Sequence, residues 1–454
     1  MELKGKKVLV IGSGISGIGA VKLLAAKEAG VVLFDSNEAL DPAALREKLG
    51  TDVEAEIYTG TLPLAVAEQI QWVIPSPGVP CDTGMVAEFR DKRIPVTGEI
   101  ELAYQAEKGT LIGITGTNGK TTTTSLVGEI MKEHYKKVFV VGNIGNPYTT
   151  EVSHTTKDSV TVAEISSFQL ETVQDFHPHV SAILNITPDH LNRHHTMETY
   201  AAVKEKIAGK QTPEDTCVLN YENEYTREYA AMCPASVVFF SSARELQNGY
   251  FLRDDQIWFA ENGKEEALLN IHTDMNLVGT CNVENVMAAI AIARGMKVPM
   301  AAILRAIRKF KAVEHRIEYV AEKAGVVYYN DSKGTNPDAA IQGIKAMSRP
   351  TILIGGGYDK KNEYDTWIEA FDGKVKLLVL IGQTREKIAE CAKKHGFTDY
   401  VFADSFEEAM DLCVKHACPG DAVLLSPACA SWGMFPNYEV RGQMFKEYVA
   451  GLKE

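Results

Sequence analysis

The sequence predicts an α/β protein of three domains, each built on a mostly parallel sheet. Two observations support this prediction. Apolar runs of strand length alternate with helical runs along most of the chain. Glycine-rich turns also follow such apolar runs near residues 12 and 116, where parallel sheets bind phosphate groups. We expect domains at residues 1–97, 98–312 and 313–454.

The first domain is expected to be Rossmann-like. A strand at Lys7–Ile11 leads into Gly12-Ser-Gly14-Ile-Ser-Gly17 and a helix through Ala26, and a second strand at Val31–Phe34 ends in Asp35. This G-x-G-x-x-G pattern with a following acid is typical of dinucleotide sites, but its glycines and helix start suit any nucleotide diphosphate. A later strand ends at Ile74–Val79 beside the same site. Glycines that serve only close helix–strand packing remain an equal alternative.

The central domain contains a phosphate loop and is expected to resemble P-loop ATPases. Residues 113–124 read Gly-Ile-Thr-Gly-Thr-Asn-Gly-Lys-Thr-Thr-Thr-Thr after a buried strand. Lys120 offers a charge to the outer phosphates of a nucleoside triphosphate, and Thr121 offers a hydroxyl to Mg²⁺. The spacing departs from the generic loop, because Ile114 stands where a glycine is usual. A glycine-rich turn with a solvated lysine is the disfavoured alternative.

Further polar groups follow strand ends in this domain. Strands are expected at Lys137–Val141, Val160–Ile165 and Val180–Ile186. Glu164 would then complete the oxygen shell of the Mg²⁺ with Thr121. His190 follows the third strand and is expected to bind a second ion or the substrate. A structural histidine that caps a helix or is hydrogen-bonded is the alternative. We also predict helices at Met197–Ala208 and Asn282–Arg294. A hairpin is predicted at Tyr250–Ala260, with its turn at Asp254-Asp255.

Lys204 lies on the helix that follows His190. An ammonium group near Mg²⁺ would be repelled by the ion, whereas a carbamate formed from the lysine and CO₂ would be an anion and could bind it. The alternative is one more solvated lysine, as we expect for Lys206 and Lys210.

The third domain is predicted to be a second open, Rossmann-like sheet, with its ligand groups at the carboxyl ends of the strands. Its expected strands are Val326–Tyr329, Thr351–Ile354, Leu377–Ile381, Tyr400–Phe402 and Ala422–Leu425. Its expected helices are Pro337–Met347, Arg385–His395 and Ser405–His416.

Composition limits the classes of function. The net charge of −13 argues against non-specific nucleic-acid binding. The eight cysteines show no C-x-x-C or zinc spacing, and no signal peptide or membrane-length apolar run is visible, so we expect reduced thiols and a cytoplasmic protein without membrane insertion.

Four stretches together resemble the Mur ligase family of ATP-dependent, amide-forming enzymes of peptidoglycan precursor synthesis. The first stretch is shared with folylpolyglutamate ligases, and the others are more specific to the branch that adds D-glutamate. The stretches are Thr115–Thr121, Glu164–Leu170, Asn330–Asn336 and Ser426–Ser431.

The resemblance implies a ligase that joins D-glutamate to UDP-N-acetylmuramoyl-L-alanine through an acyl phosphate and a tetrahedral intermediate, releasing ADP and phosphate. It implies ATP, two Mg²⁺ ions and a carbamylated Lys204 as metal ligand, small-molecule partners and a monomer. The C-terminal domain would close about a hinge near residues 312–316. The residues implied as catalytic are Lys120, Glu164, His190 and Lys204.

The same resemblance assigns binding residues. ATP would contact Gly116, Thr117, Asn118, Gly119, Lys120, Thr121, Thr122, Asn282, Asn285, Arg316 and Asp331. The metal ligands would be Thr121, Glu164, His190 and Lys204. The UDP-linked substrate would contact Gly14, Ile15, Ser16, Ser36, Ser76, Gly78, Asn143, Ser166 and His190. D-Glutamate would contact Lys333, Thr335, Lys360, Ser431 and Tyr438, and surface charge is the alternative for the two lysines.

The sequence departs from the family pattern at a few positions. Cys281 stands where histidine is frequent, Asn37 where arginine is common, and Tyr438 in place of phenylalanine, while Trp432-Gly433 differs from the commoner residues after Ser431. These departures concern binding detail.

Three rival functions remain open. An NAD-dependent oxidoreductase would leave the Lys120 loop without a role, and an ATP-hydrolysing switch would release phosphate without any amino acid. A ligase of the same class could use another amino acid.

Overall fold

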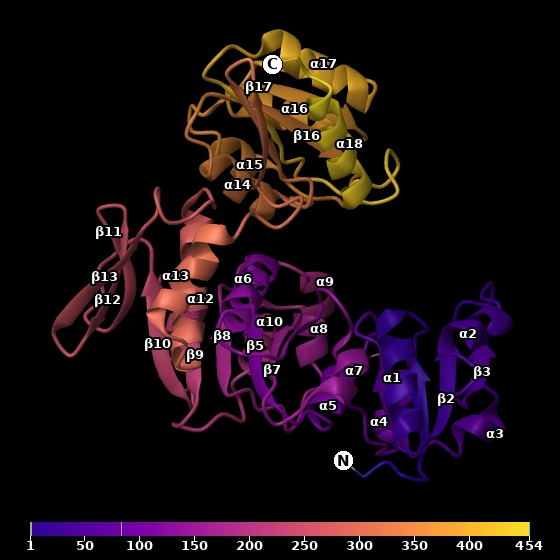
Figure 1. Cartoon of the computed structure of the whole chain (residues 1–454). Coiled ribbons are helices and arrows are strands. Elements are labelled where there is room, and N and C mark those ends of the chain that lie inside the picture. The colour runs from indigo at the N-terminus through magenta and orange to yellow at the C-terminus, as the bar shows by residue number, and fades with distance from the viewer. Residues whose placement is uncertain (1, 83, 454) are drawn as a thin grey trace. The chain divides into compact units, whose positions relative to one another are not determined.

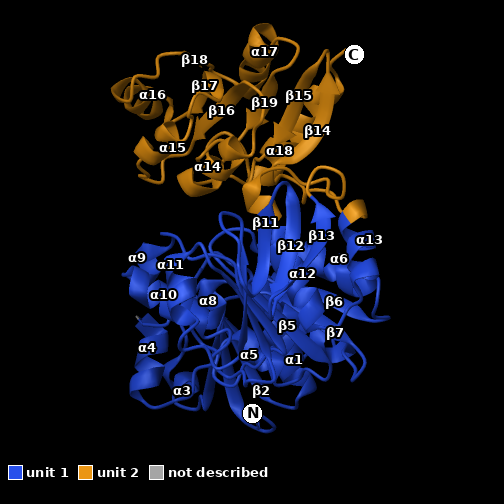
Figure 2. Cartoon of the chain, turned by 90° about the vertical axis from the view of Figure 1, so that its left-hand side faces the viewer, with its two compact units in different colours: residues 1–270, 285–307 blue, residues 271–284, 308–454 orange. Residues whose placement is uncertain are grey.

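The computed structural model describes residues 2–82 and 84–453. The chain divides into two compact units (Figure 2). Unit 1 comprises residues 1–270 and 285–307, and unit 2 comprises residues 271–284 and 308–454. Unit 1 contains two sheets and unit 2 contains one (Figure 1). The predicted α/β class with three mostly parallel sheets is therefore confirmed.

The first sheet has four parallel strands in the order β3-β2-β1-β4. The predicted first strand and second strand are present, and the first helix begins immediately after Gly14. Its strands are β1 Lys7–Ile11, β2 Gly30–Asp35, β3 Glu56–Thr59 and β4 Trp72–Pro75. The helices are α1 Ile15–Ala26, α2 Pro42–Leu49, α3 Leu64–Ala67 and α4 Gly84–Asp91.

The second sheet has nine strands in the order β13-β12-β11-β10-β9-β8-β5-β7-β6. The strands from β6 to β11 in this order pair in parallel with their neighbours. The last two pairings, of β11 with β12 and of β12 with β13, are antiparallel. The hairpin predicted at Asp254-Asp255 is confirmed, with both residues at positive φ. The strands are β5 Thr110–Thr115, β6 Val138–Gly142, β7 Val160–Glu164, β8 Val180–Ile183, β9 Thr216–Asn220, β10 Ser236–Ser241, β11 Gly249–Arg253, β12 Gln256–Glu261 and β13 Lys264–Asn270.

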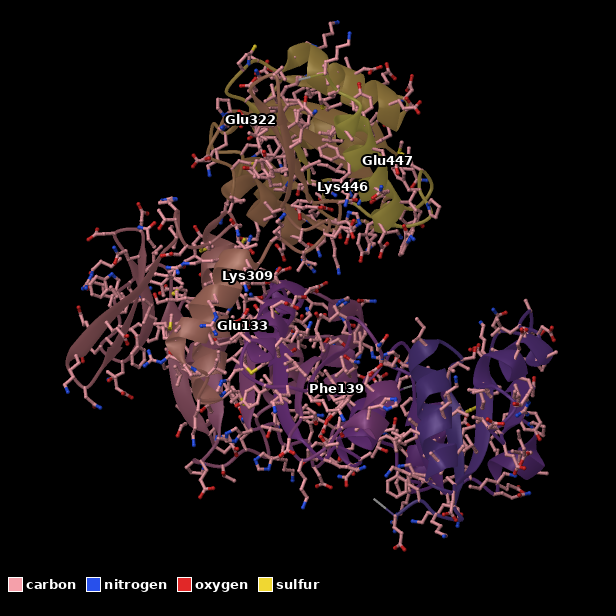
Figure 3. All side chains as sticks on the ribbon, in the orientation of Figure 1. Glu133, Phe139, Lys309, Glu322, Lys446 and Glu447 are labelled. Atoms are coloured by element: carbon pink, nitrogen blue, oxygen red, sulfur yellow. The ribbon has the colours of Figure 1, made fainter. Side chains whose placement is uncertain are left out.

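Helices of the same region connect these strands. Glu133, labelled in Figure 3, follows α6 and pairs with Arg305 of α13 at 3.0 Å, which ties these two helices together. The helices are α5 Glu99–Tyr104, α6 Lys120–Lys132, α7 Tyr148–Glu151, α8 Ser167–Leu170, α9 Leu191–His194, α10 Met197–Glu205, α11 Glu224–Tyr229, α12 Thr280–Gly295 and α13 Met300–Lys309, with a 3₁₀ turn at Val152–His154.

The third sheet has six strands in the order β14-β15-β19-β16-β17-β18, and only β14 is antiparallel. All five predicted strands are present. The strands are β14 Glu318–Lys323, β15 Val326–Asn330, β16 Thr351–Gly357, β17 Val375–Gly382, β18 Tyr400–Phe402 and β19 Ala422–Leu425. The helices are α14 Pro337–Lys345, α15 Asp365–Glu369, α16 Arg385–Lys394, α17 Phe406–His416 and α18 Tyr438–Ala450.

Buried aliphatic strands form the cores of all three sheets. Within residues 2–82 and 84–453, no helix is both long enough and apolar enough to cross a lipid bilayer.

Each sheet has a strand that is flanked on both sides by parallel strands from other parts of the sequence. In the first sheet β1 lies between β2 and β4, in the second β5 lies between β7 and β8, and in the third β19 lies between β15 and β16. Crevices at the carboxyl ends of such strands are the usual ligand sites of open α/β sheets. Many of the predicted site residues follow these strands or their neighbours in the same sheets.

Candidate active site

The phosphate loop connects β5 to α6 and is held in shape by the segment after β8. The backbone N–H of Thr117 donates to the Asn185 carbonyl at 2.9 Å, and the N–H of Asn118 donates to Asn185 Oδ1 at 2.8 Å. Gly119 has a φ of 83°, and a Cβ there would lie 2.2 Å from Oδ1 of Asn285. Only glycine fits this position, where the loop turns into the helix.

Two lysine side chains converge on one carbonyl of this loop. Lys120 Nζ donates to the Gly116 carbonyl and the Thr117 carbonyl, both at 2.8 Å. Lys204 Nζ donates to the same Gly116 carbonyl, also at 2.8 Å. Lys204 therefore lies beside the phosphate loop, and the solvated alternative for this lysine is wrong.

Lys204 is enclosed by the protein. Its exposed fraction is 1%, and its Nζ lies 4.7 Å from the ring centroid of Tyr200. Burial lowers the pKa of Lys204 well below its ordinary value, and the charge of Lys120 lowers it further, against a smaller opposing effect of Asp189. The neutral amine is therefore more accessible here than in an exposed lysine.

Glu164 ends β7 beside the loop and has one uncompensated oxygen. Its Oε1 accepts a hydrogen bond from Asn143 Nδ2 at 2.7 Å, whereas its Oε2 is buried and lacks a hydrogen-bond partner among the described residues. A buried carboxylate oxygen without a donor is costly unless a cation neutralises it. Together with Thr121 in the first turn of α6, this oxygen fits the hard ligand set that Mg²⁺ prefers.

His190 lies after β8 in the left-handed backbone region, with a φ of 53°. Its side chain makes no capping bond to α9, so the capping form of the alternative is wrong, but its Nε2 lies 3.5 Å from Asp189 Oδ2, so a structural role through that carboxylate stays open. The imidazole is 48% exposed, and its ring centroid lies 4.8 Å from that of Phe168. It is therefore accessible to a ligand.

The predicted substrate residue Ser166 already has local bonds. Its hydroxyl and the side chain of Gln169 form a capping box at the start of α8. Gln169 in turn donates to Glu99 at 2.7 Å. Burial raises the pKa of Glu99 to about 7, although the Gln169 bond opposes the shift. Sequence reasoning missed Glu99, which resembles any charged residue of a helix.

The glycine loop of the first sheet is fastened by Asp35. Both the N–H and the hydroxyl of Ser13 donate to Asp35 Oδ2, at 2.8 and 2.7 Å, and the Asn37 N–H donates to Oδ1 at 3.0 Å. Burial would raise the pKa of Asp35, but these hydrogen bonds outweigh it and hold the pKa below its usual value. In a dinucleotide site this acid would bind a ribose, whereas here both oxygens hold the protein's own loop.

Glycine is required for packing within the same loop. A Cβ at Gly17 would lie 1.9 Å from the Gly12 carbonyl oxygen, and one at Gly12 would lie 2.7 Å from Ser76 Oγ. The packing explanation therefore holds for these two glycines. A Cβ at Gly14 or at Gly78 would meet nothing within 4 Å, so the backbone there is open to a ligand. Ile15, which follows Gly14, is 78% exposed, Ser36 is also exposed, and Ser16 is partly buried.

Asp331 follows β15 in unit 2 and is buried. Its Oδ2 accepts from the Ser426 hydroxyl at 2.6 Å, and its Oδ1 accepts from the Ile317 N–H at 3.2 Å. Burial raises the pKa of Asp331 to about 7, partly offset by the Ser426 bond and the charge of Arg316. The Nε of Arg316 is itself buried without a hydrogen-bond partner among the described residues.

The two asparagines predicted at the ATP site lie on α12. Asn282 Nδ2 donates to the Val278 carbonyl at 2.8 Å, and Asn285 Oδ1 accepts from Thr123 Oγ1 of α6 at 3.2 Å. Their neighbour Cys281 packs against the core of unit 2.

The two lysines predicted to bind D-glutamate each lie beside an aromatic ring in unit 2. Lys333 Nζ lies 5.3 Å from the ring centroid of Tyr438, and Lys360 Nζ lies 5.1 Å from that of Trp432. Trp432 also lines a cavity of about 430 Å³ at the carboxyl ends of β16 and β17. The backbone N–H of Thr335 donates to the Lys333 carbonyl, and Ser431 is buried. The structure thus brings cations to this sheet edge.

Sequence reasoning also missed Arg441, the fully buried cation of α18. Its guanidinium donates to Ser332 Oγ at 2.9 Å, to the Ser332 carbonyl at 2.7 Å and to the Cys429 carbonyl at 3.3 Å. Burial lowers its pKa to about 10. Arg441 therefore joins the loops after β15 and β19, and no local pattern distinguishes it from the exposed charges of a helix.

A second missed group joins the first two sheets. Arg193 donates two hydrogen bonds to Glu171, at 2.9 and 2.7 Å, and a third to the Val79 carbonyl at 2.8 Å. It therefore fixes the turn after β4, which holds the predicted Ser76 and Gly78, to the central domain.

Comparison with known families identifies the class of this protein. Residues 6–98 match the profile "Mur ligase MurD-like, N-terminal domain", residues 114–293 match "Mur ligase middle domain", and residues 315–429 match "Mur ligase, glutamate ligase domain". The chain belongs to the Mur ligase family.

Curated relatives that match this chain over its full length share one enzyme name. The chain is 58% identical over 452 residues to a UDP-N-acetylmuramoylalanine–D-glutamate ligase of Lachnospira eligens, and 44% identical over 454 residues to the enzyme of that name from Clostridioides difficile. In both cases the match covers 100% of both chains.

Solved structures support the fold. The UDP-N-acetylmuramate–alanine ligase MurC of Thermotoga maritima matches with a TM-score of 0.61 and 19% identity, covering 98% of this chain and 99% of its own. The MurF ligase of the same organism, solved in complex with ADP, matches with a TM-score of 0.58 and 15% identity, covering 99% and 96%.

Proposed function

We propose that this protein joins D-glutamate to the alanine carboxylate of UDP-N-acetylmuramoyl-L-alanine, with ATP as the phosphoryl donor. The observation that carries the proposal is the buried, uncompensated Oε2 of Glu164 beside a phosphate loop, in a chain 58% identical end to end to a ligase of that name. ADP and phosphate would be the other products.

The chemistry explains why a phosphate loop is needed. A carboxylate resists attack by an amine, because it is an anion with a poor leaving group. Phosphorylation of the alanine carboxylate gives an acyl phosphate, and the amine of D-glutamate then attacks its carbonyl carbon. The tetrahedral intermediate collapses with loss of phosphate, and the amine proton leaves to solvent.

Residues of the loop would stabilise the transfer. Lys120 would neutralise charge on the transferring phosphoryl group, and the N–H groups at the start of α6 would hold the other phosphates. Thr121, Glu164 and His190 would hold Mg²⁺, of which two ions are expected. When bound, Mg²⁺ neutralises charge on phosphate oxygens and orients them.

We also propose that Lys204 carries a carbamate. The support is its burial and lowered pKa, because only the neutral amine attacks CO₂. Its nitrogen bonds to the carbon of CO₂, one N–H proton leaves, and the product is an anion that can bind Mg²⁺. Loss of the ammonium charge also removes its repulsion with Lys120.

In unit 2, Lys333 and Lys360 are proposed to bind the carboxylates of D-glutamate, with Thr335, Ser431 and Tyr438 beside them. The support is the presence of these cations at the carboxyl edge of the third sheet. We propose that ATP is also contacted by four polar side chains, Asn282, Asn285, Arg316 and Asp331.

The UDP-linked substrate is proposed to bind in unit 1. Its UDP part would contact Gly14, Ile15, Ser16, Ser36, Ser76 and Gly78, and its muramoyl part would contact Asn143, Ser166 and His190. We further propose a cytoplasmic monomer.

A direct assay tests the function. The protein is mixed with ATP, Mg²⁺ and UDP-N-acetylmuramoyl-L-alanine, and phosphate release is compared for D-glutamate, L-glutamate, L-lysine and diaminopimelate. Release that depends on D-glutamate, with a matching amide product by mass spectrometry, supports the proposal. Release without any amino acid favours the switch, and tight NADH binding without ATP binding favours the oxidoreductase.

A further inference from the structure

A cluster of metal-ligating side chains lies between α15 and α16 of unit 2, and the function described above gives it no role. Asp365 and Glu369 are four residues apart on α15, and Cys391 and His395 are four residues apart at the end of α16. Residues at this spacing lie on one face of a helix. One ligand atom each from Asp365, Cys391 and His395 lie within 4.8 Å of one another.

The contacts within the cluster are close to those of a bound metal. His395 Nε2 lies 2.8 Å from Asp365 Oδ1, and its Nδ1 lies 3.7 Å from Glu369 Oε1. Zinc bonds to nitrogen, oxygen and sulfur are about 2.0–2.3 Å long, so two ligands of one ion lie about 3–4 Å apart. Small rotations of the half-buried Asp365, Cys391 and His395 side chains would therefore bring three ligand atoms to bonding distance of one ion.

Lys394 occupies part of this space, because its Nζ lies 2.7 Å from Asp365 Oδ1. The lysine side chain is 71% exposed, so it can turn into solvent and lose only a surface ion pair. The charges then favour a cation, since Glu363 and Glu369 also lie near the thiol and the imidazole.

We propose that the cluster is a binding site for a thiophilic divalent cation, of which Zn²⁺ is the best match. Cys391 Sγ, the Nε2 of His395 that faces Asp365, and a carboxylate oxygen of Asp365 are its ligands, and a water molecule takes the fourth position. Binding transfers the Cys391 thiol proton to solvent and replaces it with a metal–sulfur bond. Mixed sulfur, nitrogen and oxygen ligands select Zn²⁺ over Mg²⁺, which prefers oxygen alone. The ion would clamp the five-residue α15 to α16.

Cobalt provides a spectroscopic test on the full chain. Co²⁺ bound through a thiolate gives a charge-transfer band in the near ultraviolet, whereas Co²⁺ at an all-oxygen site gives none. We expect the band to saturate at one equivalent and to disappear when Zn²⁺ displaces Co²⁺. Cys391→Ser should abolish it, and His395→Gln should weaken Co²⁺ binding by about tenfold or more. Cys418→Ser, which alters an exposed cysteine outside the cluster, should leave it unchanged.

Thermal unfolding provides an independent readout. A saturating excess of Zn²⁺ should raise the melting temperature by roughly 5 °C in the unaltered protein. The rise within each variant should vanish in Cys391→Ser and in Asp365→Asn, whatever their starting stability. Absence of the cobalt band, its persistence in Cys391→Ser, or an equal rise in all variants would overturn the proposal.

Discussion

At the scale of single residues, the charge on Lys120 is expected to act on the transferring phosphoryl group. Lys120→Ala should lower turnover by about 10²–10³-fold, the usual cost of removing one donor from a developing charge. Binding of the UDP-linked substrate should not change, because Lys120 is not among the residues proposed to contact that substrate. Steady-state kinetics and calorimetry measure the two quantities. Near-normal turnover would reject the assigned ATP site.

Lys204 permits a chemical rescue. Lys204→Ala should be inactive, because it can form no carbamate, and short-chain carboxylic acids should restore part of the turnover by filling the vacated space with an anion. Lys206→Ala, on the same helical segment, serves as the control and should stay active without added acid. An active Lys204→Ala variant that acids do not affect would reject the carbamate.

Asp331 gives a pH dependence with a defined sign. Its native pKa is about 7 and its unfolded value about 3.9, so between these pH values the native state holds a proton that the unfolded state has released. The free energy of unfolding should therefore fall by about 2–4 kcal/mol as pH rises from 4 to 7, and stay at the lower level above 7.

Asp331→Asn should lack this slope. Its stability relative to the unaltered protein should improve between pH 5 and pH 8 in urea titrations. Asp372→Asn, at an exposed position, is the control, and its free energy of unfolding should change with pH in parallel with that of the unaltered protein. Parallel curves for both variants would contradict the assigned pKa.

At the scale of elements, the phosphate loop depends on Gly119. Gly119→Ala combines a positive φ with a clash against Asn285, so it should lower stability by more than about 2 kcal/mol and abolish ATP binding. Gly263→Ala separates the two effects, because it has a φ of 76° and open space around it. That control should cost about 1 kcal/mol and leave nucleotide binding intact. Equal costs in urea unfolding would show that the clash is unimportant.

Elements also show what the sequence could and could not predict. Strands such as β5, β7 and β19 were predictable because each is a continuous buried apolar run bounded by turn residues. The helix α18 is not predicted from the sequence, because it adjoins no recognisable motif and its buried Arg441 looks like an ordinary surface charge. The order of strands was also beyond prediction, since it depends on pairing between distant segments. The site residues after strand ends were predictable, whereas their partners Asn185, Ser13 and Ser426 required coordinates.

At the scale of the whole molecule, the proposed chemistry divides between two compact units. The groups for phosphoryl transfer lie mainly in unit 1, and the cations for the amino acid lie in unit 2. Lys360→Ala should therefore raise the KM for D-glutamate by about tenfold or more, while a single turnover with ATP and the UDP-linked substrate still forms ADP at the normal rate. Lys120→Ala should lose that first step. Rapid-quench measurement of ADP formation distinguishes the two variants. An equal loss of ADP formation in both would contradict the division of the chemistry between the units.

The carbonyl of Gly116, which accepts bonds from two lysines, shows what the protein gives up for its chemistry. Burial of an unmodified lysine at position 204, opposite the charge of Lys120, disfavours its charged form and so lowers the stability of the folded state. A hydrophobic residue of similar length would make a sturdier protein without an anion to offer a metal. With the proposed carbamate on Lys204, the supply of dissolved carbon dioxide would affect the stability of this enzyme as well as its activity, because CO₂ would convert an unfavourably buried amine into an anion that can bind a metal.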